Sequence, residues 1–133
     1  MANNTTFFGT TINESATIIR PAAAAIDGAQ GIALALGATG LTKPSAGNPV
    51  IGLSLFTNDD GVAEGTEITV QVKDIGKWIA NAAFAAGTLL ATDANGKAVA
   101  AKSGDFIVAQ ALTASTAAGD VVTVQIIKAG FAA

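Results

Sequence analysis

The stretch Glu67-Ile-Thr-Val-Gln-Val-Lys73 decides the fold class, because apolar and polar residues alternate along it. Ile68, Val70 and Val72 share one face of an extended chain, and the polar residues between them share the other. The stretch 121–128 repeats this alternation near the end of the chain. A period of two residues is typical of a β-strand with one buried face, so the sequence predicts an all-β protein.

Short apolar runs separated by Gly, Asn, Asp and Ser predict the remaining strands. Asp93-Ala-Asn-Gly96 lies between two such runs and predicts a hairpin, because Asn-Gly readily adopts the left-handed conformation of a tight turn. Residues 77–86 are rich in Ala and stop at Gly87, which leaves open a short helix or a loop. The expected strands are 17–20, 32–36, 50–56, 67–73, 88–92, 98–101, 106–112 and 121–128.

An internal similarity relates residues 31–76 to residues 87–130, with offsets of 56, 57 and 54 residues along the segment. The offset changes only in loops, where insertions cost little. One three-strand module cannot bury its apolar face alone, whereas two can bury it against each other. We therefore expect residues 16–133 to form one domain, a small β-sandwich or barrel built from two similar three-strand modules. The matched pairs are Gly31 with Gly87, Gly40 with Gly96, Val50 with Ile107, Gly52 with Ala109, Leu55 with Leu112, Gly65 with Gly119, Val70 with Val124, Val72 with Ile126 and Gly76 with Gly130.

The charge and hydropathy pattern excludes several kinds of partner. A net charge of −3, with its few basic residues scattered, does not attract nucleic acid. Residues 1–11 carry no basic residue or apolar run, so no signal peptide is expected, and the long uncharged stretch 21–46 is interrupted by Asp27 and Lys43. We therefore expect no membrane partner. Charged residues make up 13% of the chain, against about 25% in ordinary domains, which fits either a surface covered by a partner or a neutral surface.

Catalytic groups are scarce. The chain has no His, Cys or Tyr, so a nucleophilic Ser or Thr lacks its usual base. The pairings Lys102-Ser103 and Lys43-Pro-Ser45 lie in polar, turn-like segments where Lys is normally solvated. No segment has the spacing of a phosphate-binding glycine loop. The sequence predicts a protein that is not an enzyme and has no cofactor.

Two acidic clusters are candidates for a cation. Asp59-Asp60-Gly61 is followed by Glu64, and Asp93-Ala-Asn-Gly96 resembles the start of a calcium loop. The closing Glu of such a loop is missing, because position 104 is Gly. Asp and Asn at these positions are more often turn residues that bond to their own backbone, so we expect no metal site.

Three aromatic residues are candidates for a partner interface. Phe7 and Phe8 stand in an otherwise polar segment, residues 1–15, which we interpret as an extended N-terminal arm. The pair is expected to dock on its own domain or on another chain. Trp78, the single Trp, is either a core residue or an anchor at a subunit interface, where Trp is enriched.

The second half of the chain resembles a known family. The similarity is carried by Ala86-Gly-Thr-Leu-Leu-Ala-Thr-Asp-Ala-Asn-Gly-Lys-Ala-Val-Ala100, by Ser103-Gly-Asp-Phe-Ile-Val-Ala-Gln-Ala-Leu112 and by Ala118-Gly-Asp-Val-Val-Thr-Val124. These segments resemble the hairpin and the two Gly-Asp strands of the capsid decoration (cement) proteins of tailed bacteriophages. The resemblance covers roughly residues 65–128. The chain departs from the family's pattern at Ala109, where Gly is usual.

The resemblance implies a small β-protein that is made in the host cytoplasm and stabilises the virion by binding the outer capsid surface at capsomer junctions. It implies the major capsid protein as a partner, and a homotrimer. Another β-rich structural subunit, from a tail, a fibre or a surface layer, is the alternative. A carbohydrate-binding module is a further one, although such modules favour exposed Trp and Tyr.

Overall fold

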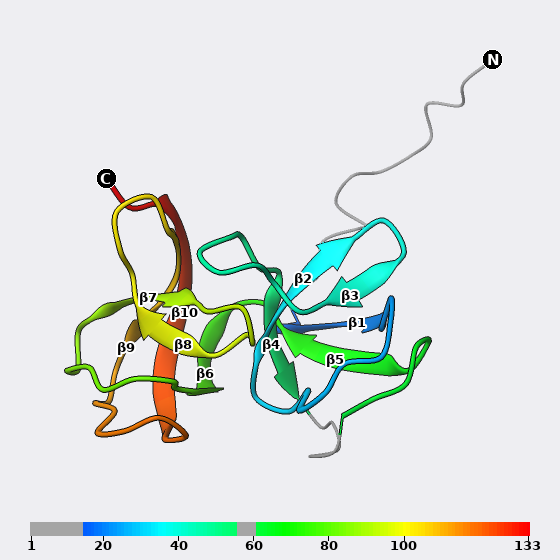
Figure 1. Cartoon of the computed structure of the whole chain (residues 1–133), viewed down its shortest axis with the longest axis horizontal. Coiled ribbons are helices and arrows are strands. Elements are labelled where there is room, and N and C mark those ends of the chain that lie inside the picture. Colours follow the sequence, from blue (N-terminus) through cyan, green and yellow to red (C-terminus); the bar gives the residue numbers. More distant parts are fainter. Residues whose placement is uncertain (1–14, 56–60) are drawn as a thin grey trace.

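The computed structural model describes residues 15–55 and 61–133, and these ranges contain ten β-strands and no helix (Figure 1). The all-β fold class is thereby confirmed. No described segment forms a helix of the length and apolarity needed to cross a membrane. The strands are β1 Thr17–Pro21, β2 Ala33–Gly37, β3 Gly40–Thr42, β4 Gly52–Leu55, β5 Glu67–Gln71, β6 Asp74–Ile79, β7 Leu89–Thr92, β8 Ala98–Ala100, β9 Phe106–Ala111 and β10 Val121–Phe131.

The strands form two five-stranded sheets, in which every pairing is antiparallel. The order of the first sheet is β1-β5-β4-β2-β3, and that of the second is β6-β10-β9-β7-β8. Figure 1 shows the first sheet on the right and the second on the left. Neither sheet closes into a barrel within the described residues, so the sandwich is the correct one of the two predicted architectures.

The two sheets have the same strand order, because each strand of the second sheet occupies the place of the first-sheet strand numbered five lower. The pairing agrees residue by residue: Ser54 pairs with Val70 in the first sheet, and Ala111 pairs with Val124 in the second. These residues differ by 57 and 54 positions, the offsets found in the sequence. We call β1–β5 the first unit and β6–β10 the second unit.

Contacts outside the strands recur as well. Ala22, which follows β1, forms a parallel bridge with Leu41, and Ala80, which follows β6, forms one with Ala98. The Ala22 carbonyl accepts a hydrogen bond from the amide of Gly65 at 2.8 Å. The Ala80 carbonyl accepts the equivalent bond at 2.7 Å, from the amide of Gly119. The two units therefore share their loop closures as well as their strands.

The structure has no helix at residues 77–86, where the sequence left a short helix or a loop open. Residues Asp74–Ile79 form strand β6, which pairs with β10, and residues 80–87 contain two isolated β-bridges, a bend and a turn. Ile75, Lys77 and Ile79 alternate with residues of the opposite face, and a β-branched residue at two of these positions favours a strand over a helix. Each unit has five strands and is larger than the predicted three-strand module. In each unit one strand was not expected, β3 in the first and β6 in the second, and the expected strand β1 lies outside the matched segment 31–76.

The core is divided between the units. The first unit encloses one cluster of buried apolar residues, and the second unit encloses another that also includes three residues of the first. The shared cluster ties the units together. The first cluster is Ala22, Ile26, Ala29, Ile32, Leu34, Leu41, Ile68 and Val70. The second is Ala33, Val50, Leu53, Trp78, Ala80, Leu90, Ala98, Val108, Ala109, Ala111, Val122, Val124 and Ile126.

Part of the predicted organisation lies outside the described residues. This applies to Phe7, Phe8 and all of the predicted arm except Ser15. It also applies to the end of the strand expected at 50–56, of which Gly52–Leu55 is described as β4.

Candidate interaction surface

The two units meet at the turn between β7 and β8. The carbonyl oxygen of Gly96 in this turn accepts two hydrogen bonds, from Nε1 of Trp78 at 2.8 Å and from the amide of Ala33 at 2.7 Å. The first bond comes from the second unit and the second bond from the first unit. A further backbone bond, from the amide of Ile79 to the carbonyl of Gly31 at 3.0 Å, also crosses between the units. Trp78 thus holds the turn on which the first unit rests.

Gly96 is required at this turn for two reasons. Its φ of 77° is in the left-handed region that residues with a Cβ atom avoid. A Cβ atom there would also lie 2.5 Å from the carbonyl oxygen of Ala33 and 3.0 Å from Cβ of Ile32. The close approach of the units therefore depends on the absence of a side chain at position 96.

Lys128 makes a third link between the units. Strand β10 pairs with β9 through a bulge between Ile126 and Gly130, and Lys128 lies in it with a φ of 44°. From this position its Nζ donates to the carbonyl oxygen of Ile51 in the first unit. Partial burial lowers the pKa of Lys128, because the charged form loses hydration.

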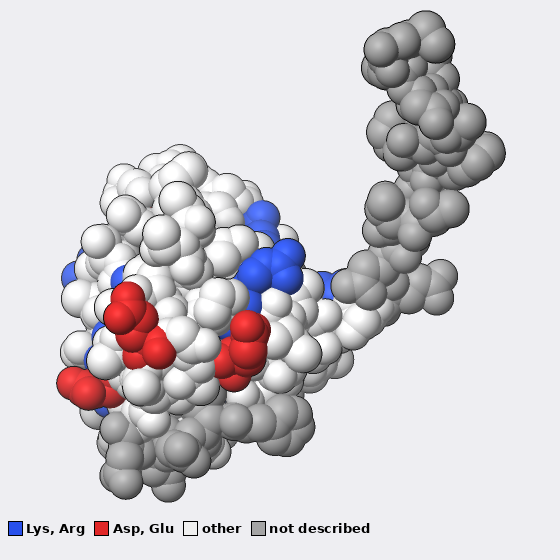
Figure 2. All heavy atoms as spheres, turned by 90° about the vertical axis from the view of Figure 1, so that its right-hand side faces the viewer, with Lys and Arg blue, Asp and Glu red and all other residues white. Residues whose placement is uncertain are grey.

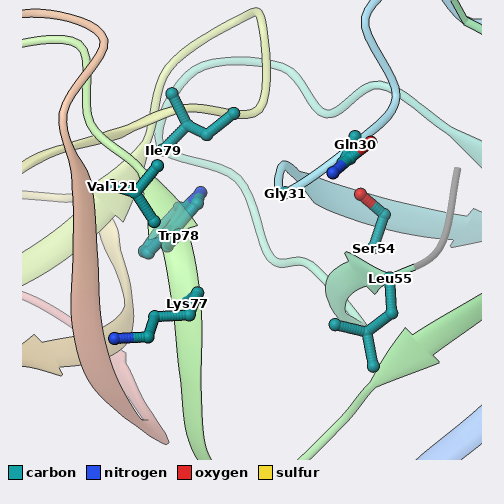
Figure 3. Close-up of a pocket in the computed structure, with 8 residues that line it drawn as sticks. All are labelled: Gln30, Gly31, Ser54, Leu55, Lys77, Trp78, Ile79 and Val121. Atoms are coloured by element: carbon teal, nitrogen blue, oxygen red, sulfur yellow. The ribbon is translucent and has the colours of Figure 1, made fainter. Parts of the chain in front are cut away.

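A cleft with a volume of about 390 Å³ lies between the units (Figure 3). Gln30, Gly31, Ser54 and Leu55 line it from the first unit, and Lys77, Trp78, Ile79 and Val121 line it from the second. Figure 3 shows these two groups of residues facing each other across the gap. Most of the lining is apolar.

The polar groups of the cleft are engaged in structural bonds. The hydroxyl of Ser54 donates to the carbonyl of Ala29 and accepts from the amide of Ile32 at 3.1 Å. Nζ of Lys77 donates to the hydroxyl of Thr123. Neither group is arranged as a nucleophile with a base at hydrogen-bonding distance, so the described bonds of these groups stabilise the structure of each unit.

The second sheet presents an exposed row that contains no charge. Ile75, Gln125, Gln110 and Leu89 lie side by side across β6, β10, β9 and β7. The exposed fractions of Ile75 and Leu89 are 59% and 42%. We call these four residues the outer row. Leu112, which follows β9, is also 42% exposed. Apolar side chains this exposed on one sheet are candidates for contact with a partner.

Charges are sparse elsewhere on the surface. Figure 2 shows the face that includes the first unit, where a few acidic and basic groups are separated by wide uncharged areas. With 17 charged residues in 133, of both signs, long-range attraction to an oppositely charged partner is weak. Contact with a partner would depend on shape, apolar area and hydrogen bonds.

Trp78 is a core residue. Its side chain is 0% exposed in the second cluster, and its Nε1 is already bonded to Gly96, so the ring offers no surface to a partner. Of the two interpretations of Trp78 that the sequence left open, its position in this structure is the core one. The cause is β6, which was not expected as a strand and which places Trp78 opposite Val122 inside the second unit.

The acidic clusters behave as turns where they are described. Oδ1 of Asp93 accepts bonds from the amides of Asn95 and Lys97, both at 2.9 Å, and Oδ2 accepts from Asn81 Nδ2 at 2.6 Å. These bonds close the predicted hairpin between β7 and β8. Asp59 and Asp60 lie outside the described residues. The described ranges contain no group of three or more His, Cys, Asp or Glu side chains placed to hold a metal ion.

Asp120 closes the turn before β10. Its Oδ2 accepts bonds from the amide of Thr116 at 2.8 Å, the hydroxyl of Thr116 at 2.9 Å and the amide of Ala117 at 3.3 Å. These bonds, led by the one from the Thr116 amide, lower the pKa of Asp120 because they favour its charged form. Of the two Lys–Ser pairings in the sequence, Lys102 and Ser103 are exposed, whereas Lys43 is half-buried and Ser45 is exposed.

Comparison with known proteins places the fold. No family model matches the chain, and no curated protein matches its sequence. Among solved structures, the fold is similar to the one described as the head fiber gp8.5 N base of bacteriophage phi29. The TM-score is 0.64 at 16% sequence identity, and the match covers 88% of this chain and 98% of that one. At this identity the likeness shows a shared fold.

Proposed function

We propose that this protein is a non-catalytic structural component of a bacteriophage virion that decorates the capsid. In this proposal it binds the outer surface at capsomer junctions, with the major capsid protein as its partner, and associates with itself as a homotrimer. The observation that carries the proposal is the likeness to a phage head fiber base over nearly the whole length of both chains. The sequence resemblance to cement proteins, which rests on different information, supports the same class.

The surface chemistry supports this role. A capsid presents many identical sites in fixed geometry, so weak contacts made by several copies add up to strong attachment. A surface with sparse charge and exposed apolar residues on its second sheet suits such contacts. The inter-unit cleft, whose polar groups are bonded structurally, gives no support to an enzymatic role.

Co-sedimentation with capsids of the phage that encodes the protein tests the proposal. We expect the full chain to pellet with expanded capsids, to saturate at a fixed number of copies per capsomer, and to remain in solution with unexpanded ones. Deletion of residues 2–12 is expected to weaken binding while leaving the far-ultraviolet circular dichroism spectrum unchanged. If the protein fails to bind expanded capsids at every capsid concentration, the proposal is refuted.

The likeness to a head fiber base also favours a second candidate, the base of a fibre. Immunogold labelling of intact virions distinguishes these roles. Decoration predicts label distributed over the head, a head fibre predicts label on projections from it, and a tail subunit predicts label on the tail. A glycan array tests the carbohydrate-binding alternative, for which we expect no signal.

A further inference from the structure

The outer row of the second sheet has a counterpart in the first. Strand order and pairing make the two sets equivalent, position by position. The row in the first sheet is Ala33, Leu53, Gln71 and Thr17, paired across β2, β4, β5 and β1. The outer row is Leu89, Gln110, Gln125 and Ile75, paired across β7, β9, β10 and β6 in the same way. We call the first set the covered row.

The two rows differ in exposure. Ala33 and Leu53 are 0% exposed and Gln71 is 9% exposed, whereas the equivalent Leu89 is 42% exposed, Gln110 is half-buried and Gln125 is exposed. At the fourth position, Thr17 is half-buried and Ile75 is 59% exposed. Each position is thus more exposed in the second unit than in the first. The difference lies in what covers each row.

The second unit covers the covered row. The amide of Ala33 donates to Gly96 in the β7–β8 turn, and Leu53 belongs to the core cluster of the second unit. Nε2 of Gln71 donates to the carbonyls of Lys73 at 2.9 Å and Ile75 at 2.8 Å, where the chain enters β6. A β7–β8 turn and the start of a first strand are therefore the elements that this fold places over this row.

The first unit carries the same two elements, and both are at least partly exposed among the described residues. Its β2–β3 turn, which corresponds to the β7–β8 turn, has Ala38 and Thr39 exposed at its tip. The start of β1 corresponds to the start of β6, and Thr17 there is half-buried. One chain thus presents an open row at one end and the elements that cover such a row at the other.

We propose that the outer row is a docking surface for the first unit of a second copy of this chain. The β2–β3 turn of the second copy would lie over Leu89, as the β7–β8 turn lies over Ala33 within one chain. The row has no charge, so its burial leaves no unpaired ion. Its two central residues are Gln, and Nε2 of Gln110 already donates to the carbonyl of Gly87 at 3.1 Å. The contact joins two different surfaces, so repeating it gives a ring if the rotation closes and a chain of copies if it does not. The inference rests on the self-association part of the proposed function and specifies its geometry.

Disulfide trapping tests this geometry directly, because the chain contains no native Cys. Leu89→Cys and Thr39→Cys are prepared in separate proteins and mixed under mild oxidation. The proposal predicts a covalent dimer in the mixture and its loss when either variant is oxidised alone. Phe131→Cys, at a position 63% exposed outside the row, is the control and is expected to give no dimer with Thr39→Cys. Dimers of Leu89→Cys with itself, which a twofold contact would produce, or no dimer in the mixture would overturn the proposal.

A second variant measures the contact without cross-linking. Leu89→Lys combined with Ile75→Lys places two charges on the outer row at exposed positions, so folding is retained and self-association is lost in sedimentation velocity. Unchanged association would overturn the proposal. Capsid co-sedimentation in parallel separates this inference from the proposed function. If no cross-linked dimer forms but the protein still binds capsids, only the docking geometry is refuted. If the dimer forms but the protein does not bind capsids, only the capsid role is refuted.

Discussion

Replacing Trp78 by Phe tests the junction between the units. Phe retains most of the buried ring but lacks the Nε1–H that donates to Gly96. Loss of this hydrogen bond costs about 1 kcal/mol, and no acceptor is left bare because the Ala33 amide still bonds to Gly96. The smaller ring leaves a void in a fully buried site, which adds roughly 1–2 kcal/mol. We expect the free energy of unfolding to fall by about 2–3 kcal/mol in total.

Urea unfolding followed by circular dichroism measures this change. Ile19→Ala, at a position of β1 that is 56% exposed and outside the cleft, is the control and is expected to stay within about 0.5 kcal/mol of the parent protein. In the parent protein, the fluorescence of Trp78, the single Trp, reports the junction between the units, while circular dichroism reports the strands of both units. The shared core cluster predicts that the two transitions coincide. A Trp78→Phe protein as stable as the control, or two separate transitions in the parent protein, would refute the reasoning about the junction.

Three further changes test particular residues. Gly96→Ala is expected to lower the free energy of unfolding by more than the roughly 1–2 kcal/mol that a left-handed φ costs, because its Cβ atom would also clash with Ala33. Gly119→Ala is the control: its φ is 96° and nothing lies near its Cβ position, so only the conformational cost is expected in the same urea assay. Because the pKa of Lys128 is lowered in the folded protein, the unfolded chain binds more protons than the folded one between this pKa and the ordinary Lys value of about 10.4. Stability therefore rises with pH in this range, and Lys128→Met should abolish that rise in thermal melts. The lowered pKa of Asp120 stabilises the folded protein at pH values above the ordinary carboxyl pKa. This stability is lost as the pH falls through the pKa of Asp120 in the folded protein, so Asp120→Asn should lose less stability on acidification than the parent protein. An unchanged acid slope in this variant would assign the slope to other carboxylates.

Alternation and turn chemistry were sufficient to predict most strands. In β5 and in residues 122–126 of β10 every second residue is apolar, and the Asp93 hairpin has the turn residues that its geometry needs. Strand β3 gave no such signal, because three residues starting at a Gly are too short to show a period. The Ala-rich continuation after β6 concealed a strand that tertiary pairing with β10 stabilises. Context of this kind overrides local propensity.

The candidate site was less accessible from the sequence. The offsets between the halves pointed to equivalent positions, and these offsets recur in the residue pairings of the two sheets. That Leu89 is open while Ala33 is buried depends on how one unit rests on the other, and no local pattern encodes this difference. The Lys128 bulge was missed for the same reason, since its partner Ile51 is 77 residues away.

High-resolution images of capsids, recorded with and without the added protein, show whether it attaches to the outside of a phage head. We expect additional density at junctions between capsomers on the outer surface, with the shape of the two-unit fold. Density confined to the tail, or a head that looks the same in both preparations, would contradict this expectation.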